Sequence, residues 1–417
     1  MWQAEEVINA RQAAFETLYK ICYDHAYSNI AVDHALSGLK EGKAFAARLV
    51  YGVLERQITL DFLIHQYCSK PKPKLRIILR MGTYQLYFMN KVSSAAAVDE
   101  SVKLAKANGL TYYSSFINAV LHKIDANRID LECLSDLSVR YSVPQNLINM
   151  WIKAYGKDKV LHFLPALNGR PPVFAVANAN FTDAETLCGI LNKEGADCSV
   201  FNGLVKINAS ADLTALTAFE NGLFHIQDIS CVTALIALDI HDGDTVFDFC
   251  AAPGGKSFTA SYLCGKNGTV YSFDLHESRV RLIQNSAERL SLKNVKARVN
   301  DASLFCAGLG TADKIICDVP CSGFGIIRRK PEIRYKDLDS VKGLAEIQFN
   351  ILSTSSKYLK PKGRLLYSTC TLNKKENENV VTKFLQCNPE FSLLEMKTIF
   401  PGENEGDGFF YSIIERN

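Results

Sequence analysis

The sequence predicts an α/β fold in which a doubly wound parallel sheet follows an all-helical region and a small mixed α/β unit. Apolar residues recur at helical spacing through the first third of the chain, and a short alternation of strands and helices begins near residue 171. From about residue 240, buried strands alternate with amphipathic helices, as in βαβ units. At 417 residues the chain is long enough for two or three domains.

The composition is that of a globular protein without membrane spans. Apolar residues make up 47% of the chain and charged residues 22%, and no apolar run approaches the roughly 20 residues that cross a bilayer. The first twenty residues, MWQAEEVINARQAAFETLYK, mix charges with helical spacing and do not resemble a signal peptide. We therefore expect a cytoplasmic protein.

Charge and cysteine content narrow the function further. The net charge of +3 means that any nucleic-acid surface is local. None of the thirteen cysteines forms a C-x-x-C pair or stands at zinc-finger spacing with histidine. This pattern favours reduced, mostly buried thiols over disulfides, and we expect no bound metal.

The region 10–124 is expected to form a helical bundle. The stretches AARLVYGVLERQITLDFLI and LRIILRMGTYQLYFM carry apolar residues three and four positions apart, so each presents an apolar helix face. The segment KPKPKLR at residues 70–76 separates two helices, because proline disrupts a helix interior. Its four basic side chains form either a solvated loop or a local basic patch.

The middle of the chain is expected to hold a small mixed α/β domain. A helical linker, LSVRYSVPQNLINMWIKAYG, precedes it. We expect strands in 171–178, 204–208 and 223–228, with a helix in 183–195 and another before the last strand.

The remaining chain predicts the parallel sheet. Strands are expected at TVFDF, TVYSFD, VKARV, KIICD and RLLYS, separated by helices such as ESRVRLIQNSAERL and VKGLAEIQFNILSTSSKYL. The last apolar run, FFYSIIE at 409–415, is expected to close the sheet as an antiparallel edge strand. Parallel sheets bind ligands at the carboxyl ends of their strands, so the residues that follow these strands are the functional candidates.

The first of these strands runs into 248-DFCAAPGGKS-257, whose small residues let a ligand approach the backbone. The loop resembles a Walker phosphate loop and KIICD resembles a Walker B strand, so a P-loop-like NTPase is one alternative. Against it, Cys250 occupies the position of the first Walker glycine, whose left-handed turn belongs to the phosphate nest. The dinucleotide fingerprint G-x-G-x-x-G is also absent.

Acidic residues follow the next two strands. Asp274 is placed to accept hydrogen bonds from ribose hydroxyls, and Asn300-Asp301 is placed to meet an adenine. A single aspartate at a strand end is more often a turn former or a helix cap. Together with a loop that lacks a proper phosphate site, however, they favour a nucleoside without a triphosphate, such as S-adenosylmethionine.

Two cysteines follow the last two parallel strands, Cys321 in 318-DVPCSG-323 and Cys370 in 366-LYSTCTLNKKENE-378. These strands are expected to be near in space, which brings both thiols to one ligand-binding edge. A free cysteine is usually an inert core residue, but two thiols beside a carboxylate and Lys256 indicate chemistry. A nucleophilic thiolate needs a neighbouring cation, for which Lys256 is the candidate. No histidine lies in either turn, which disfavours a Cys-His hydrolase.

These motifs resemble bacterial RNA cytosine-5 methyltransferases of the Sun/Fmu type, also called RsmB. The segments DFCAAPGGKS, DVPCSGFGIIRRKPEIR and YSTCTLNKKENE are similar to three signatures of that family and occur in the same order. The segments ARLVYGVLER, LRIILRMGTYQLYF and FINAVLHKI resemble the NusB-type helical domain of this subgroup. The resemblance covers nearly the whole chain.

The resemblance implies three domains. They are an all-helical, NusB-like RNA-binding domain at 1–130, a helical linker with a small α/β, RRM-like domain at 131–225, and a Rossmann-like methyltransferase domain with a mostly parallel seven-stranded sheet at 226–417. The implied enzyme is a monomer that uses S-adenosyl-L-methionine to methylate C5 of a cytosine in small-subunit ribosomal RNA, cytosine 967 of 16S rRNA in this family. Another rRNA or tRNA cytosine, a P-loop-like NTPase and a non-enzymatic RNA-binding factor remain alternatives.

The resemblance also implies residue roles. Cys370 would be the nucleophile that adds to cytosine C6, Cys321 would assist release of the product, and Asp318 would hold the cytosine N3 edge, with Lys256 in support. The target base must leave its stack to reach such a pocket. The cofactor would contact Cys250, Ala251, Ala252, Pro253, Gly254, Gly255, Lys256, Asp274, Arg279, Asp301 and Asp318. The charges of 326-IIRRKPEIR-334, including Arg328, Arg329 and Lys330, would follow RNA phosphates.

Three positions depart from the family pattern. Thr371 stands where serine is common, and Val319 replaces the usual alanine. Val176 stands where an arginine is expected, so one RNA or packing contact of the middle domain is expected to differ.

Overall fold

The computed structural model of the protein describes residues 9–24, 31–32, 35, 37–39, 41–208 and 212–417. It divides into two compact units. Unit 1 extends to Gly169 and also includes Ile327–Lys336, and unit 2 comprises Arg170–Ile326 and Asp337–Asn417. The chain therefore passes between the units three times.

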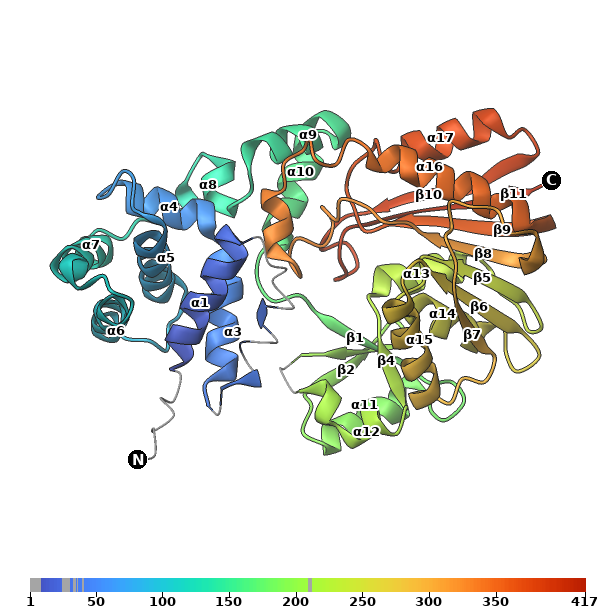
Figure 1. Ribbon diagram of the computed structural model, residues 1–417, viewed down its shortest axis with the longest axis horizontal. Coiled ribbons are helices and arrows are strands. Elements are labelled where there is room, and N and C mark those ends of the chain that lie inside the picture. The colour runs from blue at the N-terminus through green and yellow to red at the C-terminus, as the bar shows by residue number, and fades with distance from the viewer. Residues whose placement is uncertain (1–8, 25–30, 33–34, 36, 40, 209–211) are drawn as a thin grey trace. The chain divides into compact units, whose positions relative to one another are not determined.

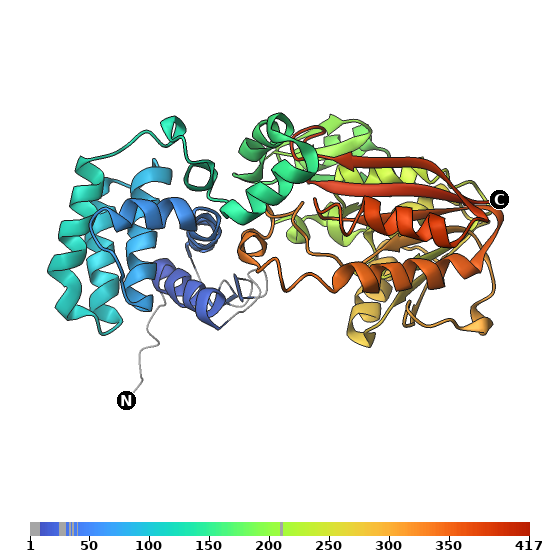
Figure 2. The same cartoon turned by 90° about the horizontal axis from the view of Figure 1, so that it is seen from above.

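Unit 1 is helical, as the sequence predicts. The helices of its bundle, blue to teal in Figures 1 and 2, are α1 (Ala10–Tyr23), α3 (Lys43–Glu55), α4 (Gln57–His65), α5 (Pro73–Phe88), α6 (Ser94–Ala107) and α7 (Ser114–Ala126). Helix α5 packs against the other five, and almost every residue from Leu75 to Leu86 is buried. It begins at Pro73, because proline is tolerated where the first turn leaves the backbone N–H unpaired. The predicted break at KPKPKLR is thereby confirmed.

Shorter helices continue unit 1 after the bundle. They are α8 (Leu137–Tyr141), α9 (Gln145–Tyr155) and α10 (Lys157–Phe163). Trp151 of α9 is fully buried against Phe163 of α10, with the rings edge-on and their centroids 5.3 Å apart. This aromatic pair makes the linker a packed part of unit 1.

The segment Ile327–Lys336 also belongs to unit 1, where its 3-10 helix η6 (Pro331–Tyr335) packs on α3. Arg334 of η6 is buried, with 1% of its surface exposed. Its guanidinium donates to the carbonyls of Glu55, Ser142, Leu167 and Ile327 at 2.8, 3.1, 3.2 and 3.4 Å, and to Oδ1 of Asn168 at 3.1 Å. Three of these acceptors lie around Nη1 and two around Nη2, so the two terminal nitrogens of the guanidinium make all five contacts.

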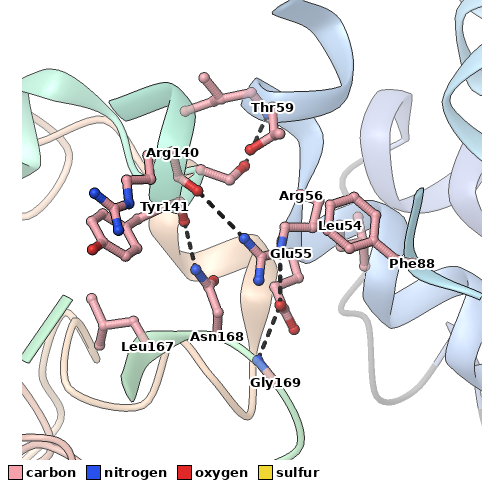
Figure 3. A network of polar contacts seen from close by, with 12 residues as sticks. Leu54, Glu55, Arg56, Thr59, Phe88, Arg140, Tyr141, Leu167, Asn168 and Gly169 are labelled. Carbon is pink, nitrogen blue, oxygen red and sulfur yellow. Dashed lines mark hydrogen bonds and ion pairs between the residues drawn. The ribbon is translucent and has the colours of Figure 1, made fainter. Parts of the chain in front are cut away.

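Polar contacts hold the acceptors of Arg334 in place (Figure 3). Glu55 accepts a hydrogen bond from the backbone N of Gly169 at 3.0 Å. The Asn168 amide donates to the carbonyl of Tyr141 at 2.9 Å. Helix α3 and the linker after α10 therefore form a fixed cluster of acceptors around η6.

Unit 2 begins with a small antiparallel sheet. Its strands β1 (Val173–Ala177), β2 (Cys198–Phe201), β3 (Leu204–Ile207) and β4 (Phe224–Ile226) pair in the order β2-β3-β1-β4. Helix α11 (Ala184–Lys193) packs on β1, β2 and β3, and α12 (Thr217–Glu220) precedes β4. Val176 of β1 is buried on the opposite face with Phe174 and Val232. Valine is therefore a packing residue at the position where an arginine was expected.

Within residues 212–417, all of which are described, the second sheet of unit 2 has seven strands in the order β10-β11-β9-β8-β5-β6-β7. They are β5 (Thr245–Phe249), β6 (Thr269–Asp274), β7 (Val295–Val299), β8 (Ala312–Asp318), β9 (Leu359–Thr369), β10 (Phe391–Ile399) and β11 (Phe409–Arg416). Strands β5 to β9 pair in parallel. Strand β11 runs antiparallel to both of its neighbours, β9 and β10. The predicted mostly parallel, seven-stranded sheet is confirmed.

One expectation about this sheet is wrong. Strand β11 contains FFYSIIE and is antiparallel as predicted, but it lies between β10 and β9 rather than at the edge. The edge is formed by β10, whose middle residues are exposed. The apolar run of β11 is buried on both faces, which is the environment of an interior strand.

Helices cover both faces of the large sheet (Figure 1). Helices α13 (Ile229–Ala237), α14 (Gly255–Leu263) and α15 (Glu277–Arg289) lie on one face, and α16 (Leu344–Ser355) and α17 (Glu378–Cys387) on the other. Along β5, Phe247 and Phe249 pack with Ile351 of α16, whereas Val246 packs with Ala260 of α14. This doubly wound arrangement leaves the carboxyl ends of the parallel strands for the site. In the described part of the chain, no helix has the length and apolar character that would span a bilayer.

Candidate active site

The two cysteine turns lie side by side. Strands β8 and β9 are parallel neighbours with Asp318 opposite Ser368, so the turns that follow them start at the same edge. The backbone N of Gly325 donates to the carbonyl of Cys370 at 3.0 Å, and the Sγ atoms of Cys321 and Cys370 are 3.3 Å apart. The structure thus brings together the two thiols identified in the sequence.

A buried carboxylate, that of Glu376, joins the two turns. It accepts hydrogen bonds from the backbone N and the hydroxyl of Ser322 at 2.9 and 2.5 Å. It also accepts from the side-chain amides of Gln348 and Asn373 at 2.9 and 2.8 Å. Four donors on one buried carboxylate fix the two turns relative to each other. Sequence analysis missed Glu376, whose only signal was its place within LYSTCTLNKKENE.

The Cys321 thiol is held in its protonated form. Its hydrogen bond with Cys370 raises the pKa of Cys321 well above the usual value, and burial and the carboxylates of Glu376 and Asp318 act in the same direction. Cys321 therefore keeps its proton near neutral pH.

Lys256 forms an ion pair with Asp318. Its Nζ is 2.7 Å from one carboxylate oxygen, and the Ser368 hydroxyl donates to the other at 2.8 Å. Burial disfavours the ammonium charge, but the neighbouring Asp318 outweighs it, and the pKa of Lys256 is raised. Lys256 Nζ also contacts Cys231 Sγ at 3.5 Å. The cation expected to act on a thiolate is thus bound to Asp318 and orients that carboxylate.

The loop after β5 lines a cavity of about 180 Å³. Helix α14 begins directly after the loop, with Gly254 as its N-cap at a φ of 110°. A Cβ on Gly254 would lie 2.3 Å from Cζ of Phe258, so the turn requires glycine. Cys250 itself adopts a left-handed φ of 62°, so the missing Walker glycine does not prevent the turn. The predicted cofactor residues that line the cavity are Cys250, Ala251, Ala252, Pro253, Gly255, Lys256 and Asp318.

The predicted nucleoside residues Asp274, Arg279 and Asp301 are not among those that line the cavity. Asp274 accepts a hydrogen bond from the backbone N of Ala252 at 3.2 Å and lies 3.5 Å from Nη1 of Arg279. Arg279 also donates to the Ala252 carbonyl at 3.0 Å, so this ion pair holds the cavity loop. Asp301 accepts from the backbone N and the hydroxyl of Ser303 at 2.9 and 2.6 Å, which is an Asx turn. Their contact with a nucleoside stays a prediction.

Two polar residues that sequence analysis did not assign to the site also line the cavity. Asp248 is fully buried at the end of β5, where Oδ2 accepts from the Ser257 hydroxyl at 2.5 Å and Oδ1 has no partner among the described residues. Gln227 directly follows β4, and its Nε2 is likewise without a partner in the described chain. In the sequence, Asp248 was recognised only as the first residue of the segment DFCAAPGGKS. No pattern in LFHIQD predicted a functional role for Gln227.

The predicted RNA-contacting residues Arg328, Arg329 and Lys330 lie in the segment of unit 1 that contains η6. Lys330 is exposed, and the two arginines are partly buried. Arg334, the last charge of the same run, is buried against carbonyl groups. The expectation that Arg334 follows RNA phosphates is therefore wrong, because the side chain is buried and both of its terminal nitrogens donate to acceptors within unit 1.

The departures in the cysteine turns are compatible with this geometry. Thr371 Oγ1 lies 2.6 Å from Ser322 Oγ, a hydroxyl contact that serine would also provide. Val319 is buried with Ile315 in the core below the turn. Neither side chain separates the two thiols, whose Sγ atoms are 3.3 Å apart.

Comparisons with known proteins match both parts of the chain. Residues 235–415 match the family model of 16S rRNA methyltransferase RsmB/F, and residues 8–126 match that of the NusB family. The chain is 34% identical to the probable ribosomal RNA small subunit methyltransferase B of Bacillus subtilis, over 92% of this chain and 89% of that protein. It is 31% identical to the protein of the same name from Synechocystis, over 98% of this chain and 100% of that protein. The solved structure of PH0851 superposes with a TM-score of 0.81 at 25% identity and covers 98% of both chains.

The methyltransferase match includes the cavity loop and both cysteine turns, and the NusB match includes the helices from α1 to α7. Relatives above 30% identity cover most of the sequence from end to end. The chain therefore belongs to the ribosomal RNA small subunit methyltransferase B family of S-adenosyl-L-methionine-dependent methyltransferases.

Proposed function

We propose that this protein methylates C5 of a cytosine in small-subunit ribosomal RNA, with Cys370 as the nucleophile and Cys321 as the residue that promotes release. The observation that carries the proposal is the pair of thiols 3.3 Å apart, in turns that start beside the cavity-lining Asp318. The named relatives act on the small ribosomal subunit, and cytosine 967 of 16S rRNA is the first target to test.

The cavity has features that fit the cofactor. Its loop of small residues leads into the N-terminus of α14, which lets a ligand approach the backbone. Asp248 and Gln227 leave one acceptor and one donor unused on its wall. When bound, S-adenosyl-L-methionine supplies an electrophilic methyl group. The residues proposed to hold it are Cys250, Ala251, Ala252, Pro253, Gly254, Gly255, Lys256, Asp274, Arg279, Asp301 and Asp318.

Cytosine C5 is a poor nucleophile, so a thiolate is needed to activate the ring. The Cys370 sulfur forms a bond to C6, and the electron pair of the C5–C6 double bond moves to make C5 an enamine carbon. After C5 has accepted the methyl group, a base removes the C5 proton. The electron pair left at C5 restores the double bond, the S–C6 bond breaks, and Cys370 leaves as a thiolate.

The environment of the two thiols supports this division of roles. The raised pKa of Cys321 keeps this thiol protonated, so it can donate a hydrogen bond to the Cys370 sulfur when Cys370 acts as the nucleophile. Cys321 then lies next to the adduct, where it can pass its own proton to solvent and take up the proton from C5 in its place. Asp318, oriented by Lys256 and Ser368, is proposed to bind the cytosine N3 and amino edge while charge develops on the ring.

Two substitutions test the roles of the cysteines. With tritium-labelled S-adenosylmethionine and 16S rRNA as substrate, Cys370→Ala should abolish methylation and form no covalent RNA adduct. Cys321→Ala should lose turnover and accumulate an adduct, seen as a shifted band on a denaturing gel. Cys387→Ala, at an exposed cysteine at the end of α17, is the matched control and should behave as the unsubstituted enzyme.

Substantial turnover by Cys370→Ala would overturn its role as nucleophile. An equal amount of adduct in both variants, or none in Cys321→Ala, would overturn the release role of Cys321. Absence of tritium from RNA with the unsubstituted protein would instead favour the NTPase or the non-enzymatic RNA-binding factor. Bisulfite sequencing of rRNA and tRNA from cells that lack the protein identifies the target cytosine.

The helical part is proposed to bind the RNA. The NusB match covers the bundle, and Lys70, Lys72 and Lys74 are exposed at the start of α5. Lys330 and its neighbours Arg328 and Arg329 are proposed as further phosphate contacts. We keep the division at residues 1–130, 131–225 and 226–417 as a proposal for the three functional parts.

A further inference from the structure

We propose that Gln227 and Asp248 form the subsite for the amino-acid end of the cofactor, with the Gln227 amide donating to its carboxylate and Asp248 accepting from its ammonium group. The inference rests on the cofactor of the proposed function and is independent of the target base. It assigns a role to the two polar atoms on the cavity wall that have no partner among the described residues, one a donor and one an acceptor.

The orientation of the Gln227 amide is set from behind. Its Oε1 accepts a hydrogen bond from the Thr259 hydroxyl at 2.5 Å and lies 3.3 Å from Nε2 of His225. These contacts occupy the oxygen end of the amide, so the Nε2 end is the one left without a partner. Gln227 is 7% exposed, and a buried N–H donor without an acceptor is rare in a native structure.

His225 and Thr259 are positioning residues for this amide. His225 is buried, and its ring packs edge-on against Phe258 of α14 at 5.6 Å between centroids. Burial lowers the pKa of His225 to about 4, so the imidazole is neutral near pH 7. The imidazole behind Gln227 therefore carries no positive charge of its own, and the unused amide donor is the group at this position that can recognise a carboxylate.

The Gln227 amide lies close to the start of α14. A Cβ on Gly255, the first residue of that helix, would be 3.8 Å from Gln227 Nε2. The N-terminus of a helix presents backbone N–H groups and partial positive charge, which favour an anion. An unused amide donor beside such a terminus indicates a carboxylate rather than a cation.

Asp248 supplies the opposite chemistry. It is fully buried, and its Oδ2 accepts from Ser257, whose hydroxyl in turn accepts from Ser272 at 2.7 Å. Its Oδ1 is buried without a donor in the described chain and belongs to a cavity-lining residue. An ammonium group would provide that donor and a compensating charge. A ligand with a carboxylate and an ammonium group on one carbon satisfies both residues.

Isothermal titration calorimetry on the full chain without RNA separates the two contacts. The probes are S-adenosylhomocysteine, decarboxylated S-adenosylmethionine, which lacks the carboxylate, and 5′-methylthioadenosine, which lacks both groups. Gln227→Leu should weaken the binding of S-adenosylhomocysteine about 10- to 100-fold, which corresponds to the loss of one hydrogen bond to a charged group. It should leave the other two affinities unchanged. Asp248→Asn should weaken the binding of S-adenosylhomocysteine and of decarboxylated S-adenosylmethionine, and leave the affinity for 5′-methylthioadenosine unchanged.

Three further variants distinguish a lost contact from misfolding. Gln227→Glu keeps the shape of the side chain and should weaken S-adenosylhomocysteine more than Gln227→Leu does, because two carboxylates then face each other. Gln284→Leu, at an exposed glutamine of α15, is the matched control and should bind all three probes normally. Thr259→Val should weaken only S-adenosylhomocysteine, and to a smaller extent.

Normal S-adenosylhomocysteine binding by Gln227→Leu or Gln227→Glu would overturn the proposal, and the unpartnered atoms would then hold buried water. Equal losses for all three probes would overturn it as well, since the residues would then shape the cavity as a whole. Because no RNA is present, either failure leaves the roles of Cys321 and Cys370 untouched, and an error in the target base leaves this subsite untouched.

Discussion

Side chains around the cavity differ in how completely their polar atoms are paired. Glu376 receives four hydrogen bonds, whereas Oδ1 of the equally buried Asp248 receives none from the described residues. An ionised carboxylate without donors is costly in a buried position. Whether Asp248 is ionised therefore depends more strongly on its surroundings than the ionisation of Glu376 does.

The raised pKa of Asp248 predicts a pH-dependent stability. Burial raises this pKa to about 7 in the folded protein, against about 3.9 in an unfolded chain. Between these values the folded protein holds the extra proton, so stability falls as pH rises from about 4 to 7, by roughly 4 kcal/mol at most. Asparagine does not titrate, so Asp248→Asn should not lose stability as pH rises through this range. Its melting temperature should therefore rise relative to the unsubstituted protein between pH 5 and pH 8, as followed by scanning calorimetry.

Glu346→Gln is the control for this experiment, since it removes one exposed carboxylate from α16. Its melting temperature should change with pH in the same way as that of the unsubstituted protein. If the melting temperature of Asp248→Asn also changes in this way, Asp248 is ionised throughout the range, and its burial does not control the proton.

Single residues of the site could be predicted where they follow a strand of the parallel sheet. Cys321, Cys370 and the Cys250 loop were identified in this way, because strand ends converge at one edge of a parallel sheet. Gln227 and Glu376 could not, because their roles depend on partners far along the chain. Thr259 is 32 residues from Gln227, and Ser322 is 54 residues from Glu376.

Among the elements, the strands of the large sheet were predictable and their order was only partly so. The apolar runs that became β5, β6 and β8 are short, largely buried and bounded by turns. Strand β10 was missed because its exposed residues, including Glu395 and Lys397, interrupt the apolar pattern. Such residues suit an edge, where they oppose pairing with another chain. Strand β2 was missed because it is only four residues long and half exposed.

The cavity loop predicts a strict requirement for glycine at position 254. Gly254→Ala would adopt an unfavourable φ of 110° and place a Cβ 2.3 Å from the Phe258 ring. We expect the melting temperature to fall by several degrees and S-adenosylhomocysteine affinity to fall at least 10-fold, since loop and helix must separate. Thermal melting and calorimetric titration measure the two effects.

Gly243→Ala is the matched control for the loop. Gly243 has a φ of 91°, but a Cβ at this position would meet no atom within 4 Å, so alanine there tests backbone strain without the clash. It should lower the melting temperature slightly and leave ligand affinity unchanged. Equal effects of the two substitutions would mean that strain alone, and not contact with Phe258, constrains the loop.

At the scale of the whole molecule, the helical and α/β parts were predictable, but the position of Ile327–Lys336 was not. This segment follows the Cys321 turn in sequence and has the composition of a basic loop, yet Arg334 and its neighbours belong to unit 1. The acceptors of Arg334 include carbonyls 279 and 192 residues away in the chain. No local pattern encodes an arginine that is buried by such distant groups.

Loss of the Arg334 side chain should loosen unit 1. In Arg334→Ala several buried acceptors lose their donors, at roughly 1–3 kcal/mol each. Hydrogen exchange should accelerate in α3 and in the linker around Ser142, with little change in β5 and β8. Lys330→Ala, an exposed residue of the same segment, should leave exchange unchanged. Faster exchange across both units would contradict a role confined to unit 1.

The three chain crossings between the units limit how this protein can have been assembled in evolution. A gene fragment that ends at Gly169 encodes unit 1 without the ten residues, Ile327–Lys336, that complete it. The helical part is therefore not a cassette that recombination can transfer in one piece. An exchange of that part between relatives has to bring matching changes in a short stretch of the catalytic half, and we expect the two stretches to have been inherited together.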